Sequence, residues 1–161
     1  MTGDRKAVGI TKLQKSYLVG RELNHSLGGV ACHAYLEISG GDIDATRLEW
    51  AWRRLMDRHV MTQVKIAKDA TVSAADDLMS NAFWLFDARS RSVAEAKGYL
   101  QDCRRNFSHR KMDLSRGQGC GLVLFLLPQN RSRMCFDIEL SICDDSRRCS
   151  MNWRCYMSIR K

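Results

Sequence analysis

The chain has 161 residues, of which 45% are apolar and 27% charged, and its formal net charge is +8 at pH 7. These values suit one globular domain, or part of a larger one, and argue against a disordered chain. No apolar run approaches the roughly 20 residues that span a bilayer, and the start of the chain lacks the apolar core of a secretory signal. The sequence therefore predicts no membrane contact and a cytoplasmic location.

Most of the excess positive charge lies at the C-terminal end. Residues 147–161 contain five basic residues and no acidic one, and without them 21 basic residues face 18 acidic ones, a net of +3. A nucleic-acid surface would need basic residues gathered on the folded body. The charge distribution therefore argues against a general nucleic-acid role.

The cysteines give no sign of a metal site. Seven cysteines lie at positions 32, 103, 120, 135, 143, 149 and 155, and none of them forms the Cys-x-x-Cys spacing of a zinc site. The histidines at positions 25, 33, 59 and 109 do not complete one either, so we expect no bound metal. In apolar surroundings, Cys32, Cys135 and Cys143 are expected to be small core residues with reduced thiols.

In the N-terminal half, apolar spacing predicts a helix over 11–23 and then a strand over 30–38. Residues 40–59 give the clearest helix. Its inward stripe contains Leu48, Trp52 and Met56, and either Asp42 or Asp44 can cap its first turn. A strand over 60–68 is expected to follow.

The next segment, 69–92, is predicted to be a loop with one short strand near 83–86. A second helix is expected over 92–114, because Ser92 and Glu95 have the spacing of a capping box. The tryptophans near these elements are expected to pack in the core or against helices, and not to form a base-stacking platform. They are Trp50, Trp52 and Trp84.

The C-terminal half ends in a predicted hairpin. A dense apolar strand over 119–128 is followed by a turn at 129–132 and by an antiparallel partner over 133–142. Helices and strands in this order predict an α/β sandwich, in which helices cover a mixed sheet.

Acidic side chains gather where the last predicted strand leaves the sheet: Asp137, Glu139, Asp144 and Asp145. At the strand period of two, Asp137 and Glu139 share one face while Ile138 takes the other. Carboxylates at the mouth of an apolar sheet are typical of sites in which a pKa is adjusted for acid/base chemistry. The alternative interpretation is that Asp137 and Glu139 face water on the polar side of an edge strand.

Five blocks of the sequence resemble, in order, a known family. They read ITKLQKSYLVGRE, LGGVACHAYLEI, DATRLEWAWRRLMDRHVM, FSHRKMDLSRG and LVLFLLPQNRSRMCFDIELSICD. They are similar to the N-terminal half of a nonribosomal peptide synthetase condensation domain, and most similar to the heterocyclisation subclass of thiazoline-forming siderophore assembly lines. The resemblance runs from about Gly9 to about Asp145. It implies a chloramphenicol-acetyltransferase-like two-layer sandwich forming one of two lobes, with an active-site tunnel between them.

The resemblance also indicates candidate site residues. The heterocyclisation pattern is Asp-x-x-x-x-Asp-x-x-Ser, and the stretch DIELSICDDSR resembles it with Glu139 at the first Asp, Asp144 at the second and Arg147 at the Ser. Only Asp144 is identical to the pattern. The resemblance implies that Asp144 braces the loop and that Glu139 replaces a site carboxylate. The His-His-x-x-x-Asp-Gly motif of ordinary condensation domains is not present in the sequence.

The reaction implied by the resemblance joins two carrier-bound thioesters. A cysteine, serine or threonine on one carrier attacks the acyl thioester on the other. Its side chain then adds to the new amide, and water leaves to give a thiazoline or oxazoline. The substrates would be carried on the phosphopantetheine of peptidyl or acyl carrier proteins, so we expect no cofactor bound directly to this chain. A second lobe, or a second copy of this chain, is a further expected partner.

The composition changes abruptly after Asp145 or Ser146. We therefore expect residues 1–146 to form the condensation lobe and residues 147–161 to be an unrelated basic tail, of the kind that an out-of-frame reading would produce. A chain truncated in this way would be inactive alone. The alternative is a non-catalytic binding module whose basic arm recruits acidic partners or nucleic acid.

Overall fold

The computed structural model describes residues 8–22, 31–75 and 82–142. In chain order, its elements are β1 (Val8–Gly9), α1 (Lys12–Glu22), β2 (His33–Gly40), α2 (Ala45–Arg58), β3 (Val64–Ile66), β4 (Thr71–Ala74), β5 (Ala82–Asp87), α3 (Val93–Phe107), β6 (Cys120–Leu127) and β7 (Arg131–Glu139). Short 3-10 helices lie at Val60–Gln63, Leu114–Arg116 and Leu140–Ile142.

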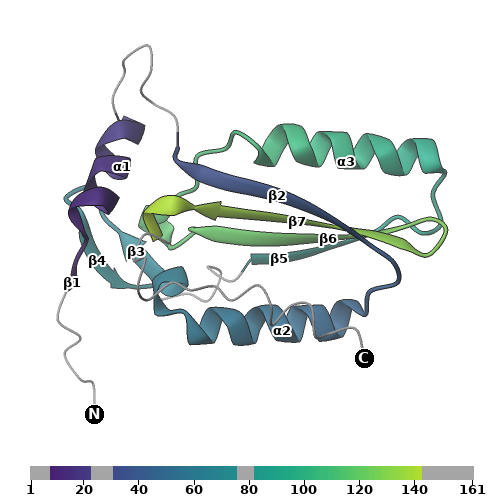
Figure 1. Ribbon diagram of the computed structural model, residues 1–161, viewed down its shortest axis with the longest axis horizontal. Coiled ribbons are helices and arrows are strands. Elements are labelled where there is room, and N and C mark those ends of the chain that lie inside the picture. The colour runs from purple at the N-terminus through teal and green to yellow at the C-terminus, as the bar shows by residue number, and fades with distance from the viewer. Residues whose placement is uncertain (1–7, 23–30, 76–81, 143–161) are drawn as a thin grey trace.

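The larger sheet has the strand order β2-β7-β6-β5. Strand β7 pairs antiparallel with both β2 and β6, whereas β5 and β6 run parallel. A parallel pair needs a crossover connection, and α3 supplies it between these two strands (Figure 1). This arrangement makes β7 an interior strand, so both of its edges are hydrogen-bonded to neighbours.

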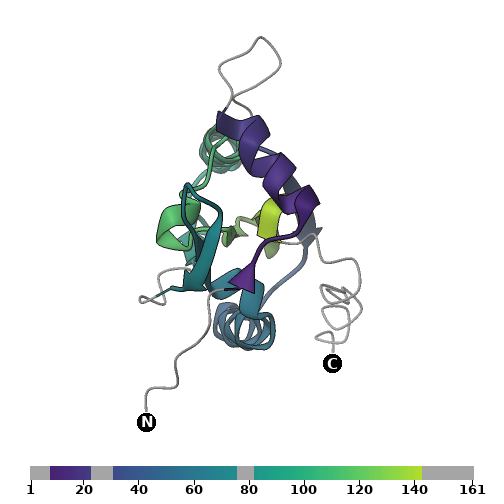
Figure 2. The ribbon, with the colours of Figure 1, turned by 90° about the vertical axis from the view of Figure 1, so that its left-hand side faces the viewer.

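Helices cover both faces of this sheet, with α2 on one side and α3 on the other (Figures 1 and 2). The α2 side packs the predicted stripe of that helix against apolar sheet residues such as Leu124 and Phe136. The α3 side packs Ala96 and Cys103 against Val123 and other sheet residues. The mixed α/β class is as predicted. Helices cover the mixed sheet, also as predicted, and they lie on both of its faces.

A smaller sheet has the order β1-β4-β3 and lies at one end of the molecule (Figure 1). The prediction that 69–92 is mostly loop is wrong for Thr71–Ala74, because these residues form strand β4. The strand predicted over 60–68 begins with the 3-10 helix, and its extended part is confined to Val64–Ile66. The short strand predicted near 83–86 is confirmed as part of β5.

The helix starts follow local sequence signals. Asp44, not Asp42, caps α2, because its Oδ1 accepts the backbone N–H of Arg47 at 3.0 Å. At the start of α3, Ser92 Oγ accepts the Glu95 N–H at 3.2 Å, and a Glu95 carboxylate oxygen accepts the Ser92 N–H at 2.9 Å. This reciprocal pair is the predicted capping box.

The predicted hairpin is also confirmed, and its second strand begins two residues earlier than expected. Gln129 and Asn130 have positive φ angles of 61° and 57°, and Arg131 already belongs to β7. Asn tolerates the left-handed region better than most residues. The turn sets the register in which Gly121 of β6 lies opposite Asp137 of β7.

Side-chain burial agrees with the sequence in part. Trp52 is only 1% exposed and meets the Phe136 ring edge-on at 5.8 Å, and Trp84 meets Phe107 of α3 at 5.9 Å. Trp50, however, is 63% exposed, so its prediction as a packing residue is wrong. Cys135 is buried as expected and Cys32 is half-buried. Cys143 lies outside the described residues.

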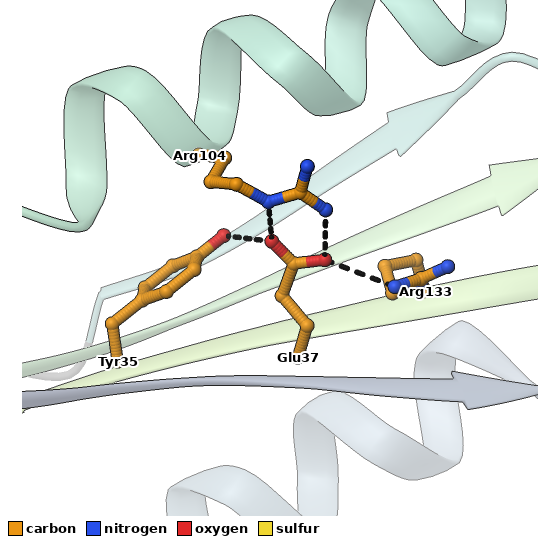
Figure 3. Close-up of polar contacts among 4 residues, drawn as sticks. All are labelled: Tyr35, Glu37, Arg104 and Arg133. Carbon is orange, nitrogen blue, oxygen red and sulfur yellow. Dashed lines mark hydrogen bonds and ion pairs between the residues drawn. The ribbon is translucent and has the colours of Figure 1, made fainter.

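A half-buried glutamate joins strands β2 and β7 to helix α3 (Figure 3). Glu37 of β2 accepts two bonds from Arg104 of α3, at 2.7 and 2.8 Å, and one from Arg133 of β7 at 2.9 Å. The Tyr35 hydroxyl donates a further bond at 3.0 Å. The pKa of Glu37 is lowered, chiefly by the bonds from Arg104. We call these four residues the Glu37 cluster.

Candidate functional site

The two carboxylates at the end of β7 lie inside the protein. Asp137 and Glu139 are both 0% exposed, because β7 is an interior strand and their face is the one that α3 covers. The alternative that they face water on an edge strand is therefore wrong. The predicted alternation is confirmed, since Ile138 packs in the core on the α2 side.

Asp137 is held by an arginine that follows α3. Arg110 Nε donates to Asp137 Oδ2 at 2.5 Å, and the guanidinium lies 4.2 Å from the centroid of the Phe107 ring. Gly121, opposite Asp137, leaves room for this contact. A Cβ there would lie 2.8 Å from the Trp84 ring and 3.3 Å from Arg110 Nη2. The glycine therefore allows Arg110 to reach the buried carboxylate.

Glu139 is held from the side of α1. Arg21 Nη1 lies 3.5 Å from Glu139 Oε1, and the Ser141 hydroxyl donates to the same oxygen at 3.4 Å. A second residue of α1, Gln14, donates to the Ser141 carbonyl at 2.8 Å. The first helix of the chain thus fixes the segment that leads out of β7.

The electrostatics of both carboxylates follow from their burial. Burial raises the pKa of Asp137 and of Glu139, and the nearby cations Arg110 and Arg21 oppose this shift. His33 is the residue opposite Glu139 on β2, and its Nε2 lies 3.1 Å from the Phe107 carbonyl oxygen. Two carboxylates, two guanidiniums and an imidazole therefore share one buried region.

This buried region has unused hydrogen-bonding capacity. Asp137 Oδ1, Glu139 Oε2 and Arg21 Nη1 have no hydrogen-bond partner among the described residues. Buried polar atoms without partners cost free energy and are few in native proteins; two further such atoms, Trp52 Nε1 and Arg133 Nε, lie outside this region. Arg21 also lines a cavity of about 690 Å³ between α1, the β3–β4 turn and the Leu114–Arg116 helix. One guanidinium therefore connects Glu139 with a surface cavity.

The structure describes only part of the predicted motif. Glu139 is in place, whereas Asp144, Asp145 and Arg147 lie outside the described residues. Arg21, His33 and Arg110 were not identified as site residues from the sequence. The only signal for them was that all three fall within blocks that carry the family resemblance, namely VGRE, ACHAYLEI and FSHRKMD.

No helix in 8–22, 31–75 or 82–142 is long and apolar enough to cross a membrane. In the same ranges, no group of three or more His, Cys, Asp or Glu side chains could hold a metal ion.

Comparisons with known proteins point to one family of relatives. No family model matches the chain. Phenyloxazoline synthase MbtB of Mycolicibacterium paratuberculosis is 30% identical over 159 residues, which is 98% of this chain and 13% of that protein. Pyochelin synthetase PchE of Pseudomonas aeruginosa is 30% identical over 135 residues, 84% of this chain and 9% of that protein. The chain thus spans a small fraction of the length of these relatives.

Solved structures agree with the sequence relatives. The EpoB cyclization-docking bidomain from Sorangium cellulosum matches 84% of this chain with a TM-score of 0.75 and 25% identity, over 27% of its own length. The starter condensation domain of rhizomide synthetase RzmA matches 86% of this chain with a TM-score of 0.70 at 12% identity, over 32% of its own length, which supports the fold alone. The chain therefore belongs with the condensation and heterocyclisation domains of nonribosomal peptide synthetases, and corresponds to part of one such domain.

Proposed function

We propose that this chain provides the N-terminal lobe of a heterocyclisation domain, within about residues 1–146, and that a second lobe completes its active site. The reaction is amide formation between two carrier-bound thioesters, followed by ring closure to a thiazoline or oxazoline, in siderophore-type synthesis in the cytoplasm. The observation that carries the proposal is the match to the EpoB cyclization-docking bidomain together with the two synthetases. The name of one of these, phenyloxazoline synthase, specifies such a ring.

The bond changes of this reaction need no cofactor held by the chain. The amine of the acceptor attacks the thioester carbonyl of the donor, the C–S bond breaks, and the leaving thiolate takes up the amine proton. The side-chain thiol or hydroxyl then adds to the amide carbonyl and passes its proton to the carbonyl oxygen; that oxygen leaves as water with the amide N–H proton, and the ring C=N bond forms. Holding two tethered substrates in line supplies much of the acceleration, and proton transfer supplies more.

Within this proposal, Glu139 is a positioning residue. Its carboxylate is fully buried, so it acts through its contacts with Arg21 and Ser141 and does not touch the substrate. Those contacts hold the segment that runs on towards Asp144, which we expect to brace the site loop. Burial raises the pKa of Glu139, and the nearby Arg21 guanidinium opposes this shift.

The test is a mass-spectrometric turnover assay. The purified chain is mixed with an acyl-loaded donor carrier and a cysteine-loaded acceptor carrier, with and without the separately expressed second lobe of a relative. Cyclised product only in the presence of the second lobe supports the proposal. Product from the chain alone contradicts the need for a second lobe. If a chain with a folded circular dichroism spectrum gives no product in either mixture, the enzymatic proposal fails.

A variant pair tests the part assigned to Glu139. Glu139→Gln keeps the size of the side chain and removes its charge, and it should lower turnover and change the pH profile of the remaining activity. Glu49→Gln on the exposed side of α2 is the matched control and should leave both unchanged. A Glu139→Gln enzyme with an unaltered pH profile would reduce this residue to a purely structural role.

A further inference from the structure

The outward side of α2 has an unusual set of exposed side chains. Arg47, Trp50, Arg54 and Arg58 follow one another at intervals of three or four residues, and so lie along one stripe of the helix. We call these four residues the α2 outer face. The opposite side of the helix, with Leu48, Trp52 and Met56, is buried against the sheet. The α2 outer face therefore lies on the side of the helix that is exposed to solvent.

Trp50 is the main apolar feature of this face. It is 63% exposed, and the Arg54 guanidinium lies 5.3 Å from the centroid of its ring. Beside it is a recess of about 290 Å³ with apolar walls, lined by Thr46, Arg47, Trp50 and Ala51. A tryptophan and arginines around a small recess are typical of the residues that dominate protein–protein binding energy.

The charge of the region is positive. Arg47, Arg54 and Arg58 form no ion pair with any described residue, whereas the neighbouring Arg53 is paired with Glu49 at 2.7 Å. Two exposed carboxylates flank these arginines, Asp44 three residues before Arg47 and Asp57 three residues after Arg54. Three arginines without ion-pair partners against two aspartates leave a local excess of one positive charge.

We propose that the α2 outer face binds an acidic protein surface, with carboxylates on the arginines and one apolar side chain in the recess beside Trp50. An arginine guanidinium can donate two parallel hydrogen bonds to one carboxylate. Complementary charges also raise the association rate of two proteins and fix their relative orientation. This inference does not depend on the proposed catalytic function. It also differs from recruitment by the basic tail, because it places the contact on a helix of the folded body.

Two other classes of partner fit this face less well. Binding to duplex nucleic acid depends mainly on many lysine and arginine contacts to phosphates, more than three arginines flanked by two aspartates provide. Insertion into a membrane surface requires an apolar helix face that is free to enter the lipid, but the apolar face of α2 is occupied by the protein core.

The experiment measures binding of a fluorescent helical peptide to the full chain by fluorescence anisotropy. The peptide has glutamates at every third or fourth position and one central leucine, and a matched peptide has glutamine in place of glutamate. We expect the glutamate peptide to bind and the glutamine peptide not to. The double variant Arg47→Glu/Arg54→Glu should weaken binding by at least about tenfold. Trp50→Ala should also weaken it by about tenfold.

The control is Lys97→Glu/Arg105→Glu, which makes the same change of net charge on exposed residues of α3. It should leave the affinity within about twofold, and the basic tail is the same in every variant. Equal weakening by this control, or binding that the α2 variants do not affect, would overturn the inference. The same holds if the glutamate peptide fails to bind wild type, or if single-stranded DNA of equal charge binds more tightly than the peptide.

Discussion

Glu37 offers the sharpest test of what holds α3 on the sheet. In Glu37→Gln the side chain keeps its length, but an amide NH₂ replaces one of the oxygens that accept bonds from arginine. One guanidinium of the Glu37 cluster then faces a donor in place of an acceptor. The Glu37 side chain is 13% exposed, whereas Arg104 is about half-exposed, so the bonds are partly screened by solvent.

The expected loss follows from these contacts. Hydrogen bonds to charged groups contribute about 1.5–3 kcal/mol each, and exposure of Arg104 reduces this. We therefore expect Glu37→Gln to lower the free energy of unfolding by about 1–2 kcal/mol. With a urea m-value of about 1–3 kcal/mol per molar, the unfolding midpoint should fall by roughly 0.5–1 M. Glu49→Gln, which breaks the exposed pair with Arg53, is the control and should shift the midpoint several-fold less.

The pH dependence of this difference is a second measure of the same cluster. Because the pKa of Glu37 is lowered in the folded chain, its ionised form contributes stability above the ordinary value of 4.5. That contribution is lost as the pH falls through the lowered value. The difference between wild type and Glu37→Gln should therefore shrink in acid. A difference that stays constant with pH, or that is no larger than the Glu49→Gln difference, would refute the reasoning.

Three further predictions concern the buried region and the core. Asp137 and Glu139 have raised pKa values, so their contribution to stability is present below the ordinary values of 3.8 and 4.5 and is lost as the pH rises through the raised ones. The double variant Asp137→Asn/Glu139→Gln should accordingly gain stability relative to wild type with rising pH in urea titrations. Trp52→Ala should cost about 3–5 kcal/mol, seen as a large fall in the thermal midpoint, and a loss below about 1 kcal/mol would contradict its place in the core. Gly119→Ala would put a Cβ 2.6 Å from Ile142 Cδ1 and should cost about 1–3 kcal/mol in denaturant titrations, whereas Gly98→Ala in α3, with nothing within 4 Å, should be neutral or stabilising.

Local signals in the sequence were enough to determine much of the secondary structure. The capping box at Ser92 and the β6–β7 hairpin depend on residues within a few positions of one another, whereas for the cap of α2 the sequence left both Asp42 and Asp44 open. Such contacts are the same in any tertiary context. The stripe of Leu48, Trp52 and Met56 likewise fixed which side of α2 is buried.

Only the tertiary structure shows that the two carboxylates of the candidate site are buried and which arginines lie beside them. The alternation of Asp137 and Glu139 is visible in the sequence, but it is compatible with an edge strand in water as well as with a buried strand. Only the position of β7 between β2 and β6 settles this, and that position depends on strand pairings that are distant in sequence. The buried cations could not be found locally either, since Arg21 comes from α1 and Arg110 follows α3. The environment of a carboxylate, and hence its pKa, is set by such long-range neighbours, which a one-dimensional pattern does not encode.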